Sequence, residues 1–363
     1  MKRVLPPLVA LVALLALNRF LPTVLNPYYF QVLILVGINI TLAVSLNLVN
    51  GFTGQFSIGH AGFMAAGAYG SAMFTVTWGQ KLAAALAAAH VPAPVAQGAL
   101  LLVSLLLGGG LAAIFGYLVG LPSLRLRGDY LAIVTLGFGE IIRVFLNNLD
   151  HPINITNGPK GIGPIDSMHV FGFEMGKRHE LFGLDIPPVV NYYFLFLTLV
   201  IVSVVICYRL ERSRIGRAWM AIREDEIAAK AMGINTRNMK LLAFGMGATF
   251  GGVAGVMFAG YQSFITPEAF SLQESIMIVA MVVLGGIGHI PGVIVGALLL
   301  AALPEVLRYV AGPLQAATDG RLDASILRQL LIATAMIVIM LLRPRGLWPS
   351  PEHGKAAPTP ASK

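Results

Sequence analysis

Charged residues are scarce in this chain. Only 12% of its 363 residues are Asp, Glu, Lys or Arg, which is about half the share found in an ordinary soluble domain. Hydrophobic residues make up 56%, and the mean hydropathy is +0.78. A soluble protein of this length needs a polar shell, and this composition does not supply one. Soluble globular folds are therefore excluded.

Cysteine is almost absent as well. Cys207 is the only one in the sequence, so a disulfide scaffold is excluded. The high apolar content excludes disorder over most of the length. The apolar runs are about 20 residues long, which is the length of a helical membrane span, whereas an outer-membrane barrel shows short alternating segments. These observations predict an all-α, polytopic helical bundle in a bacterial inner membrane.

Motifs for catalysis are missing too. The two Gly-Lys pairs, Gly176-Lys177 and Gly354-Lys355, lack the following Ser or Thr of a nucleotide-binding loop. The seven histidines form no HExxH zinc motif. We therefore expect a chain that is not an enzyme and that holds no metal or cofactor of its own. If ATP energises its activity, a partner must hydrolyse the ATP.

Instead, the chain carries a series of long apolar stretches, which predict ten membrane spans. They cover residues 4–25, 28–49, 57–78, 95–119, 130–149, 192–208, 241–261, 275–289, 292–311 and 325–342. A glycine-rich turn over 285–292 leaves the exact count there open. Spans two to five and seven to ten run in opposite senses, which is the arrangement of an inverted repeat.

The basic residues indicate how the spans are threaded, because cytoplasmic loops collect Lys and Arg. With the N-terminus inside, most basic residues fall on the cytoplasmic side, many of them in the loop 209–240, and the loop 150–191 falls in the periplasm. Both termini are then cytoplasmic. The net charge of +8 is explained by this topology, and no nucleic-acid partner is expected.

The two ends of the chain need separate interpretation. The stretch after Lys2-Arg3 resembles a signal peptide but has no convincing small-x-small cleavage site, so an uncleaved first span is predicted. The transmembrane domain then covers residues 1–348. The proline-rich tail 349–363 is predicted to be disordered.

Small residues recur at helical spacing on three predicted spans, where they let helix backbones approach closely. The sets are Gly62, Ala66 and Gly70; Gly247, Gly251 and Gly255; and Gly288, Gly292 and Gly296. Ordinary helix packing is the favoured role. Sliding of helices along these stripes is the alternative.

The loop 209–240 is too long for a simple turn. Residues 218–232 are mostly good helix formers, and Gly233 follows them as a helix C-cap. One amphipathic helix is predicted there. Its polar face would carry Arg217, Arg223, Glu224, Asp225, Glu226 and Lys230. Such a helix either lies on lipid headgroups or docks into a groove of a partner.

Residues 224–234 (EDEIAAKAMGI) resemble the EAA-type loop of ABC importer permeases, in which two alanines precede a glycine. Here these are Ala228, Ala229 and Gly233, while Ile227 stands where the family usually has glutamate. Other segments agree: NGFTGQFSIGHAGF at 50–63, RGDYLAIVTLG at 127–137, NGPKGI at 157–162, GRAW at 216–219 and VLGGIG at 283–288. Together they resemble the M-type permease subunits of branched-chain amino acid ABC importers, over about residues 30–345.

This resemblance implies a fold like that of type II ABC importers and the transport of leucine, isoleucine and valine across the inner membrane. It implies a second homologous permease, two ABC ATPase subunits that hold ATP and Mg²⁺, and a periplasmic substrate-binding protein as partners, besides the lipid bilayer. Residues 214–234 would couple the ATPases to the spans, with Trp219 and Ile222 as buried anchors and Arg217 and Arg223 as charged partners at the rim. The full candidate coupling set is Arg217, Trp219, Ile222, Arg223, Glu224, Glu226, Ala228, Ala229 and Gly233.

Polar residues interrupt the apolar pattern at two places that are candidates for the translocation path. In the segment 50–60, Gln55, Ser57 and His60 accompany three glycines. The favoured interpretation is a cytoplasmic turn in which Ser57 caps the third span and His60 is a hydrogen-bonded structural residue. The alternative is a helix N-terminus that meets the carboxylate of a substrate.

The second place is the fifth span, where Glu140 and Arg143 lie three residues apart and share one face. An unpaired charge at mid-bilayer costs at least about 2.5–3.5 kcal/mol, so the two should pair with each other or line the path. Pairing is the favoured role.

Two rival functions remain open at this level. One is a urea or short-amide permease of the same family. The other is an ion-coupled secondary transporter that uses Glu140 or His60 and has no need of the loop 209–240. Whether the loop 150–191 docks a binding protein or only connects spans is also open, as are the exact substrate and the choice between heterodimer and homodimer.

Overall fold

The computed structural model describes residues 26–123, 126, 128–151, 154–170, 173–181 and 184–317. Near the C-terminus it also describes residues 330, 333–334, 337–338, 341–342 and 346–348. The predicted span 4–25 and the predicted disordered tail 349–363 lie outside the described residues, as does most of the predicted span 325–342.

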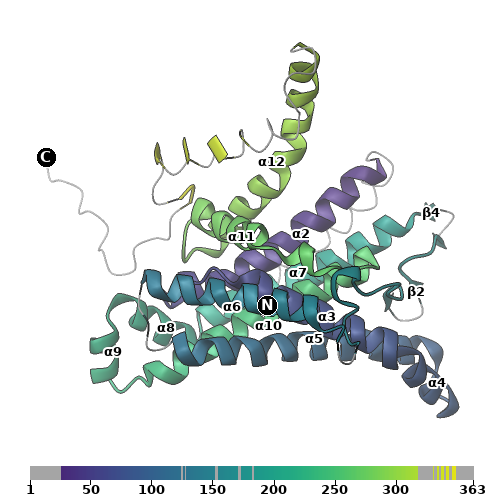
Figure 1. Cartoon of the computed structure of the whole chain (residues 1–363), viewed down its shortest axis with the longest axis horizontal. Coiled ribbons are helices and arrows are strands. Elements are labelled where there is room, and N and C mark those ends of the chain that lie inside the picture. The colour runs from purple at the N-terminus through teal and green to yellow at the C-terminus, as the bar shows by residue number, and fades with distance from the viewer. Residues whose placement is uncertain are drawn as a thin grey trace, which may run out of the picture.

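The described chain is a bundle of helices (Figure 1). Its first half contains α2 (Pro27–Asn47), the π-helical turn η1 (Leu48–Phe52), α3 (His60–Phe74), η2 (Thr75–Gly79), α4 (Gln80–Ala88), α5 (Ala93–Ser123) and α6 (Asp129–Asn148). Its second half contains α7 (Pro188–Glu211), α8 (Arg214–Glu224), α9 (Glu226–Ala231), α10 (Thr236–Gln262), the 3-10 turn η4 (Pro267–Phe270), α11 (Leu272–Gly285) and α12 (Ile290–Ala317).

Within the described part, five helical segments are long and apolar enough to cross a membrane. They are Pro27–Phe52, Ala93–Pro122, Pro188–Glu211, Thr236–Gln262 and Pro267–Gly285. The multi-pass helical character predicted from the sequence is therefore confirmed, while ten spans and an inverted repeat stay predictions. The predicted third span 57–78 is displaced, because the helix begins at His60 and continues through η2 and α4 to Ala88.

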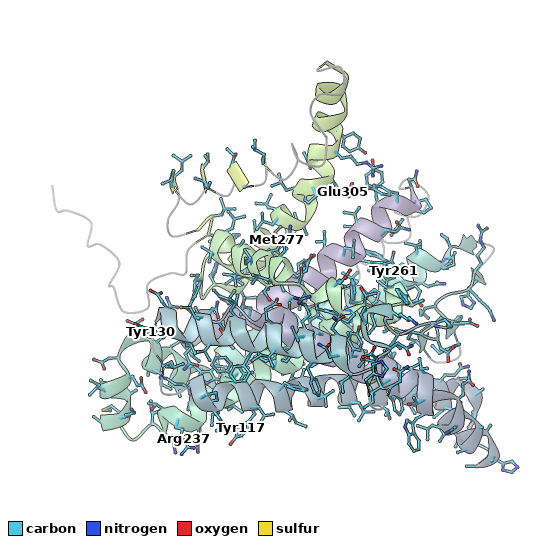
Figure 2. All side chains as sticks on the ribbon, in the orientation of Figure 1. Tyr117, Tyr130, Arg237, Tyr261, Met277 and Glu305 are labelled. Atoms are coloured by element: carbon cyan, nitrogen blue, oxygen red, sulfur yellow. The ribbon has the colours of Figure 1, made fainter. Side chains whose placement is uncertain are left out.

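The bundle has two ends that differ in structure. Figure 1 shows α8 and α9 at one end, called here the α8–α9 end, and α4 with the strands at the other, called the hairpin end. Figure 2 places Tyr130, Tyr117 and Arg237 toward the α8–α9 end and Tyr261 toward the hairpin end. Tyr117 and Tyr130 are largely exposed, as is common for aromatic residues at a membrane boundary.

Helix α10 lies at the centre of the bundle, and glycines bring its backbone against its neighbours. A Cβ atom at Gly255 would lie 2.0 Å from the carbonyl oxygen of Met64 on α3. One at Gly247 would lie 2.9 Å from Val49 on η1, and one at Gly251 3.0 Å from the ring of His60. The stripe predicted on this span thus lies in tight helix contacts.

The other two predicted stripes are split by the structure. Gly62 approaches Gly139 on α6, whereas Gly70 approaches Leu111 on α5. Gly292 and Gly296 approach Gly285 and Met281 on α11. Gly288 is different, because it lies in the turn between α11 and α12 with φ +85 rather than on a helix face.

The loop 150–191 contains two small antiparallel hairpins. β1 (His169–Val170) pairs with β2 (Phe173–Glu174), and β3 (His179–Leu181) pairs with β4 (Leu184–Ile186). The loop is also bonded to the segment after α10, because the backbones of Ile162 and Ile265 exchange hydrogen bonds of 2.9 and 3.0 Å. The described parts of the loop therefore form a cap at the hairpin end.

Candidate functional site

The buried face of α8 is formed by Trp219 and Ile222, two residues predicted to be buried anchors of the coupling segment. Trp219 is fully buried, and its Nε1 donates to the carbonyl oxygen of Met239 on α10 over 2.8 Å. Ile222 is buried beside it. Both residues anchor α8 to its own chain. Their part in coupling to an ATPase stays a prediction. A large apolar residue on an amphipathic helix shows that a face is buried, but not which molecule buries it.

The prediction of a single helix over 218–232 is wrong, because the structure has two helices there. Asp225 has an extended backbone (φ −155, ψ 111), and it separates α8 from α9. Its Oδ1 accepts hydrogen bonds from the backbone of Ile227 at 2.7 Å and of Ala228 at 3.1 Å. Aspartate is a strong N-cap because it satisfies such free amides, and here that preference restarts the helix.

Gly233 ends α9 as predicted from the sequence. Its φ is +84, in the left-handed region that glycine adopts without strain. The amide of Ile234 donates to the carbonyl oxygen of Ala229 over 3.1 Å, which is the bond of a Schellman motif. The turn sends the chain back toward α10.

Most of the charges predicted to face water or a partner form bonds within the chain. Glu226 accepts a hydrogen bond of 2.8 Å from Lys240 on α10 and pairs with Lys230 at 3.3 Å. The hydrogen bond from Lys240 and the two positive charges lower the pKa of Glu226 to about 2. Arg223 also bonds within the chain, to the carbonyl oxygen of Gly51. The residues Arg217, Arg223, Glu224 and Ala228 are exposed, while Ala229 is buried.

Two exposed apolar side chains of this segment lie outside the predicted set of coupling residues. Ile227 is 74% exposed and Met232 is 83% exposed. Single exposed apolar residues are common, but these two lie on one six-residue helix and its C-cap. The available signal was the isoleucine in place of a glutamate at 227.

Arg223 connects α8 to two places where the helices are interrupted. The first break lies between α2 and α3, and the second lies between α11 and α12. Its Nη1 donates to the carbonyl oxygen of Gly51 in η1 over 2.8 Å. A Cβ atom at Gly54 would lie 3.1 Å from its Cγ, and one at Gly288 would lie 2.4 Å from its Nη1. Two glycines, Gly54 and Gly288, thus make room for the Arg223 side chain, and Gly51 accepts its hydrogen bond. We call Arg223, Gly51, Gly54 and Gly288 the glycine junction.

Asn47 joins the two breaks directly. Its Oδ1 accepts a hydrogen bond of 2.8 Å from the amide of Gly288. In the first break, Asn50 and Ser57 exchange two hydrogen bonds, of 3.0 and 3.2 Å. These bonds hold residues 50–57 in a closed loop. Gln55 is buried within this loop, near Thr53.

The start of α3 is buried against other helices. Its N-cap is Gly59, and Ser57 makes no capping bond, so the prediction that Ser57 caps this helix is wrong. The amide of Ile58 donates to Thr135 on α6, and the amide of Ala61 donates to Ser275 on α11, each over 3.1 Å. The hydroxyl groups of Thr135 and Ser275 therefore accept hydrogen bonds from these two amides. This weakens the alternative that the amides at the start of α3 bind the carboxylate of a substrate.

His60 and the Glu140–Arg143 pair occupy separate places. His60 is buried, and its Nε2 lies 2.6 Å from the hydroxyl of Ser45. On α6, Arg143 Nε donates to Glu140 Oε2 over 2.9 Å, and each side chain is 32% exposed. Gln55, Ser57 and His60 thus gather around the start of α3, whereas Glu140 and Arg143 pair with each other. Among the described residues, no group of three His, Cys, Asp or Glu side chains is arranged to hold a metal ion.

Comparison with known proteins assigns this sequence to a family. Residues 28–341 match the family model described as branched-chain amino acid transport system / permease component. The chain is 38% identical to the high-affinity branched-chain amino acid transport system permease protein LivM of Escherichia coli K12, over 93% of this chain and 74% of that protein. It is 36% identical to LivM of Salmonella typhimurium, with the same coverage. It is 25% identical to the permease protein LivH of Escherichia coli K12, over 86% of this chain and 92% of that protein.

No solved structure matches the chain. The family match covers most of the sequence, and the first two relatives agree with it along nearly the whole chain. The chain therefore belongs to the permease family of branched-chain amino acid transport systems and is a multi-pass membrane protein.

Proposed function

We propose that this chain is the membrane-spanning permease subunit of an ATP-driven importer that carries branched-chain amino acids across the bacterial inner membrane. The family and the names of the relatives support the transport of these amino acids. The relatives include both LivM and LivH permeases, which supports assembly with a second, homologous permease. Two ATPases that hold ATP and Mg²⁺ and a periplasmic binding protein complete the proposed assembly.

The proposed topology places the α8–α9 end in the cytoplasm and the hairpin end in the periplasm, with both termini cytoplasmic. The basic loop 209–240 supports this orientation. We also propose about ten spans in an inverted repeat, with the transmembrane domain over 1–348. The support is the series of apolar stretches of about 20 residues along the sequence.

The bond from Arg223 to Gly51 is the observation that carries the proposed coupling mechanism. Trp219 fixes α8 to α10, and Arg223 at the last turn of α8 holds the break between α2 and α3. A displacement of α8 by the ATPases would therefore reach both α10 and the break. Ile227 and Met232 supply the apolar surface that an ATPase groove would cover.

Helix α6 supplies the proposed wall of the translocation path. Glu140 and Arg143 are partly exposed, and their neighbours Ile141 and Val144 are 60% and 50% exposed. A charged pair in contact with lipid is costly, so a second permease or a water-filled path should cover this face. In the assembled transporter, a spin label at Ile141→Cys should be shielded from dissolved oxygen, while one at Val202→Cys on α7 should be accessible. Equal accessibility of both labels would contradict this assignment.

Reconstitution tests the proposed function. The chain is expressed with the permease, ATPases and binding protein encoded beside it, and the complex is placed in proteoliposomes. We expect ATP-dependent uptake of labelled leucine, isoleucine and valine that requires the binding protein. Uptake of urea in their place would favour the rival permease. Uptake that follows an ion gradient without ATP would favour a secondary transporter.

A further inference from the structure

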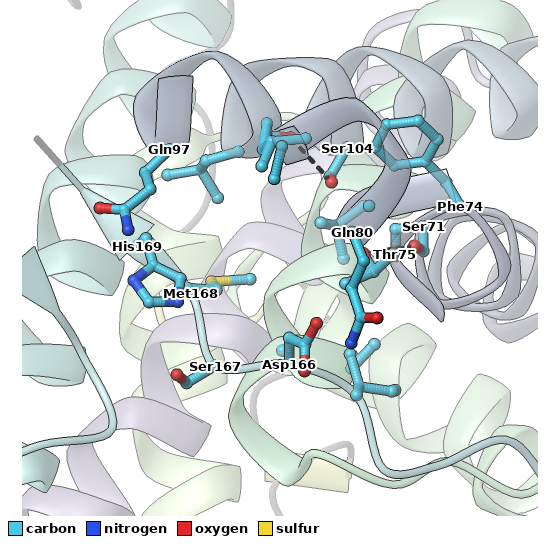
Figure 3. A pocket seen from close by; sticks show the side chains of 18 residues that line it. Ser71, Phe74, Thr75, Gln80, Gln97, Ser104, Asp166, Ser167, Met168 and His169 are labelled. Atoms are coloured by element: carbon cyan, nitrogen blue, oxygen red, sulfur yellow. Dashed lines mark hydrogen bonds between the residues drawn. The ribbon is translucent and has the colours of Figure 1, made fainter. Parts of the chain in front are cut away.

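A cavity of about 190 Å³ lies under the cap at the hairpin end. Its walls come from the end of α3, from η2 and α4, from α5, from α10 and from residues 165–169 of the loop (Figure 3). An apolar protein cavity of about 150 Å³ is large enough to admit benzene. The cavity therefore has room for a small organic molecule.

The cap over this cavity is firmly attached. The amide of Ile165 donates to the carbonyl oxygen of Ser263 over 2.8 Å. Met168 packs into the space left by the missing side chain of Gly260, where a Cβ atom would lie 2.2 Å from its methyl group. The cavity is thus a feature of the folded chain and does not depend on a loosely held loop.

Two polar atoms in the cavity lining lack a hydrogen-bond partner. They are Oε1 of Gln97 on α5 and Nδ1 of His169 in the cap. Buried polar atoms in native proteins are nearly always hydrogen-bonded, so such atoms call for an explanation. Figure 3 shows the two side chains on one side of the cavity, and Gln80 and Asp166 on another.

The rest of the lining defines the chemistry that would satisfy these atoms. Leu100, Leu101 and Val256 present apolar surface. Gln97 Oε1 is an acceptor and requires a donor. His169 Nδ1 donates to an anionic oxygen in the tautomer that carries a proton there.

We propose that this cavity binds an aliphatic amino acid. The ammonium group donates to Gln97 Oε1, the carboxylate accepts from His169 Nδ1, and the hydrocarbon side chain packs against Leu100, Leu101 and Val256. Leucine has about nine non-hydrogen atoms and suits a cavity somewhat larger than one that admits benzene. The inference rests on the proposed function, because it takes the ligand to be the cargo held at the outer face of the permease.

Equilibrium binding to the membrane complex tests the proposal. The two permeases and the ATPases are placed in nanodiscs without binding protein and without ATP, and binding of tritiated leucine is measured. We expect saturable binding to the wild-type complex. Ser104→Leu, which fills the cavity from α5, and Gln97→Leu, which removes the acceptor, should each weaken binding about tenfold or more. 4-Methylpentanoate, which lacks the ammonium group, should compete at least about tenfold more weakly than leucine.

Two further variants control for indirect effects. Thr198→Leu on α7 also replaces a hydroxyl that bonds to its own helix, as that of Ser104 does, but Thr198 lies outside the cavity. It should leave binding unchanged. If Ser104→Leu fails to assemble, Ala83→Met fills the cavity from α4 and should give the same loss.

The outcomes separate this inference from the proposed function. The inference is overturned if the complex transports leucine yet shows no saturable binding, or if Ser104→Leu and Ala83→Met both bind leucine normally. It is also overturned if lipid acyl chains, and not leucine, occupy the cavity. If leucine binds as expected but the full assembly transports no branched-chain amino acid, the proposed function fails and the amino acid site stands.

Discussion

Arg223 Nη1 lies 2.8 Å from the carbonyl oxygen of Gly51, and this hydrogen bond joins residues 172 positions apart in the sequence. The carbonyl belongs to η1, where the helix that began at Pro27 ends. Carbonyl groups at the end of a helix carry partial negative charge, which a guanidinium stabilises. The bond links the segment that we assign to ATPase coupling with a break in the membrane helices.

Replacement of Arg223 by alanine should uncouple transport from ATP hydrolysis. Charge-assisted hydrogen bonds contribute about 1.5–3 kcal/mol, so the amount of amino acid moved per ATP hydrolysed should fall about tenfold or more. Arg212→Ala is the control, because Arg212 precedes the proposed coupling segment 214–234 and its guanidinium bonds to the hydroxyl of Tyr208. Uptake and phosphate release are measured in the same proteoliposomes. Equal coupling ratios for the two variants would exclude the proposed role of Arg223.

Replacement of both Ile227 and Met232 by serine should weaken attachment of the ATPases without unfolding the chain. Burial of an apolar side chain contributes about 1.5–3 kcal/mol, so the affinity should fall at least about tenfold. Affinity is measured between the purified permease and the ATPases. Ile155→Ser, an exposed position toward the hairpin end, should have no effect. An unchanged affinity in the double variant would show that the ATPases bind elsewhere.

Trp219→Ala should act on stability instead. Loss of a fully buried tryptophan costs about 3–5 kcal/mol, and the hydrogen bond to Met239 is lost as well. We expect a lowered thermal unfolding midpoint for the detergent-solubilised chain even in the absence of partners. A midpoint that falls only when the ATPases are present would mean that Trp219 faces them after all.

Gly255→Ala and Gly245→Ala compare a crowded and an open position on α10. A Cβ atom at Gly255 would lie 2.0 Å from a backbone oxygen of α3, whereas one at Gly245 meets nothing within 4 Å. Overpacking costs about 1–3 kcal/mol, so Gly255→Ala should lower the unfolding temperature and Gly245→Ala should not. A similar effect of both substitutions would argue against close packing of α3 and α10.

Acid should loosen the α8–α9 segment through Glu226. Its pKa in the folded chain is lowered from 4.5 to about 2 by Lys240 and Lys230. The ion pairs therefore stabilise the segment above about pH 4.5, and this contribution is lost as the pH falls from there toward 2. Amide exchange of α9 should accelerate across this range in the wild type. Glu226→Gln should exchange rapidly already at neutral pH and respond less to acid, and identical profiles would count against this role.

Local sequence patterns predicted several features correctly because the interacting groups are close in the chain. Glu140 and Arg143 lie one helical turn apart, so their pairing follows from helix geometry alone. Gly233 ends α9 for a reason confined to its own backbone. Asp225 carried an equally local signal, its capping preference, but it was assigned to a polar helix face.

Features that depend on which helices become neighbours were not predictable in this way. Trp219 was assigned to a partner surface and is buried against α10. The donors at the start of α3 bond to hydroxyls from α6 and α11, and no spacing rule relates those residues. The cavity is likewise assembled from elements far apart in the chain.

The sequence by itself determined that this chain is a helical membrane protein and which permease family it belongs to, because composition, span length and ordered motifs are properties of the linear chain. Only the tertiary structure decided which molecule buries Trp219, where Arg223 binds, and that a cavity with unpaired polar atoms lies under the cap. The physical reason is that membrane spans are apolar on every side, so their hydrophobicity does not select their neighbours. That selection is made by close backbone approach and a few polar bonds, and both appear only when the helices are packed.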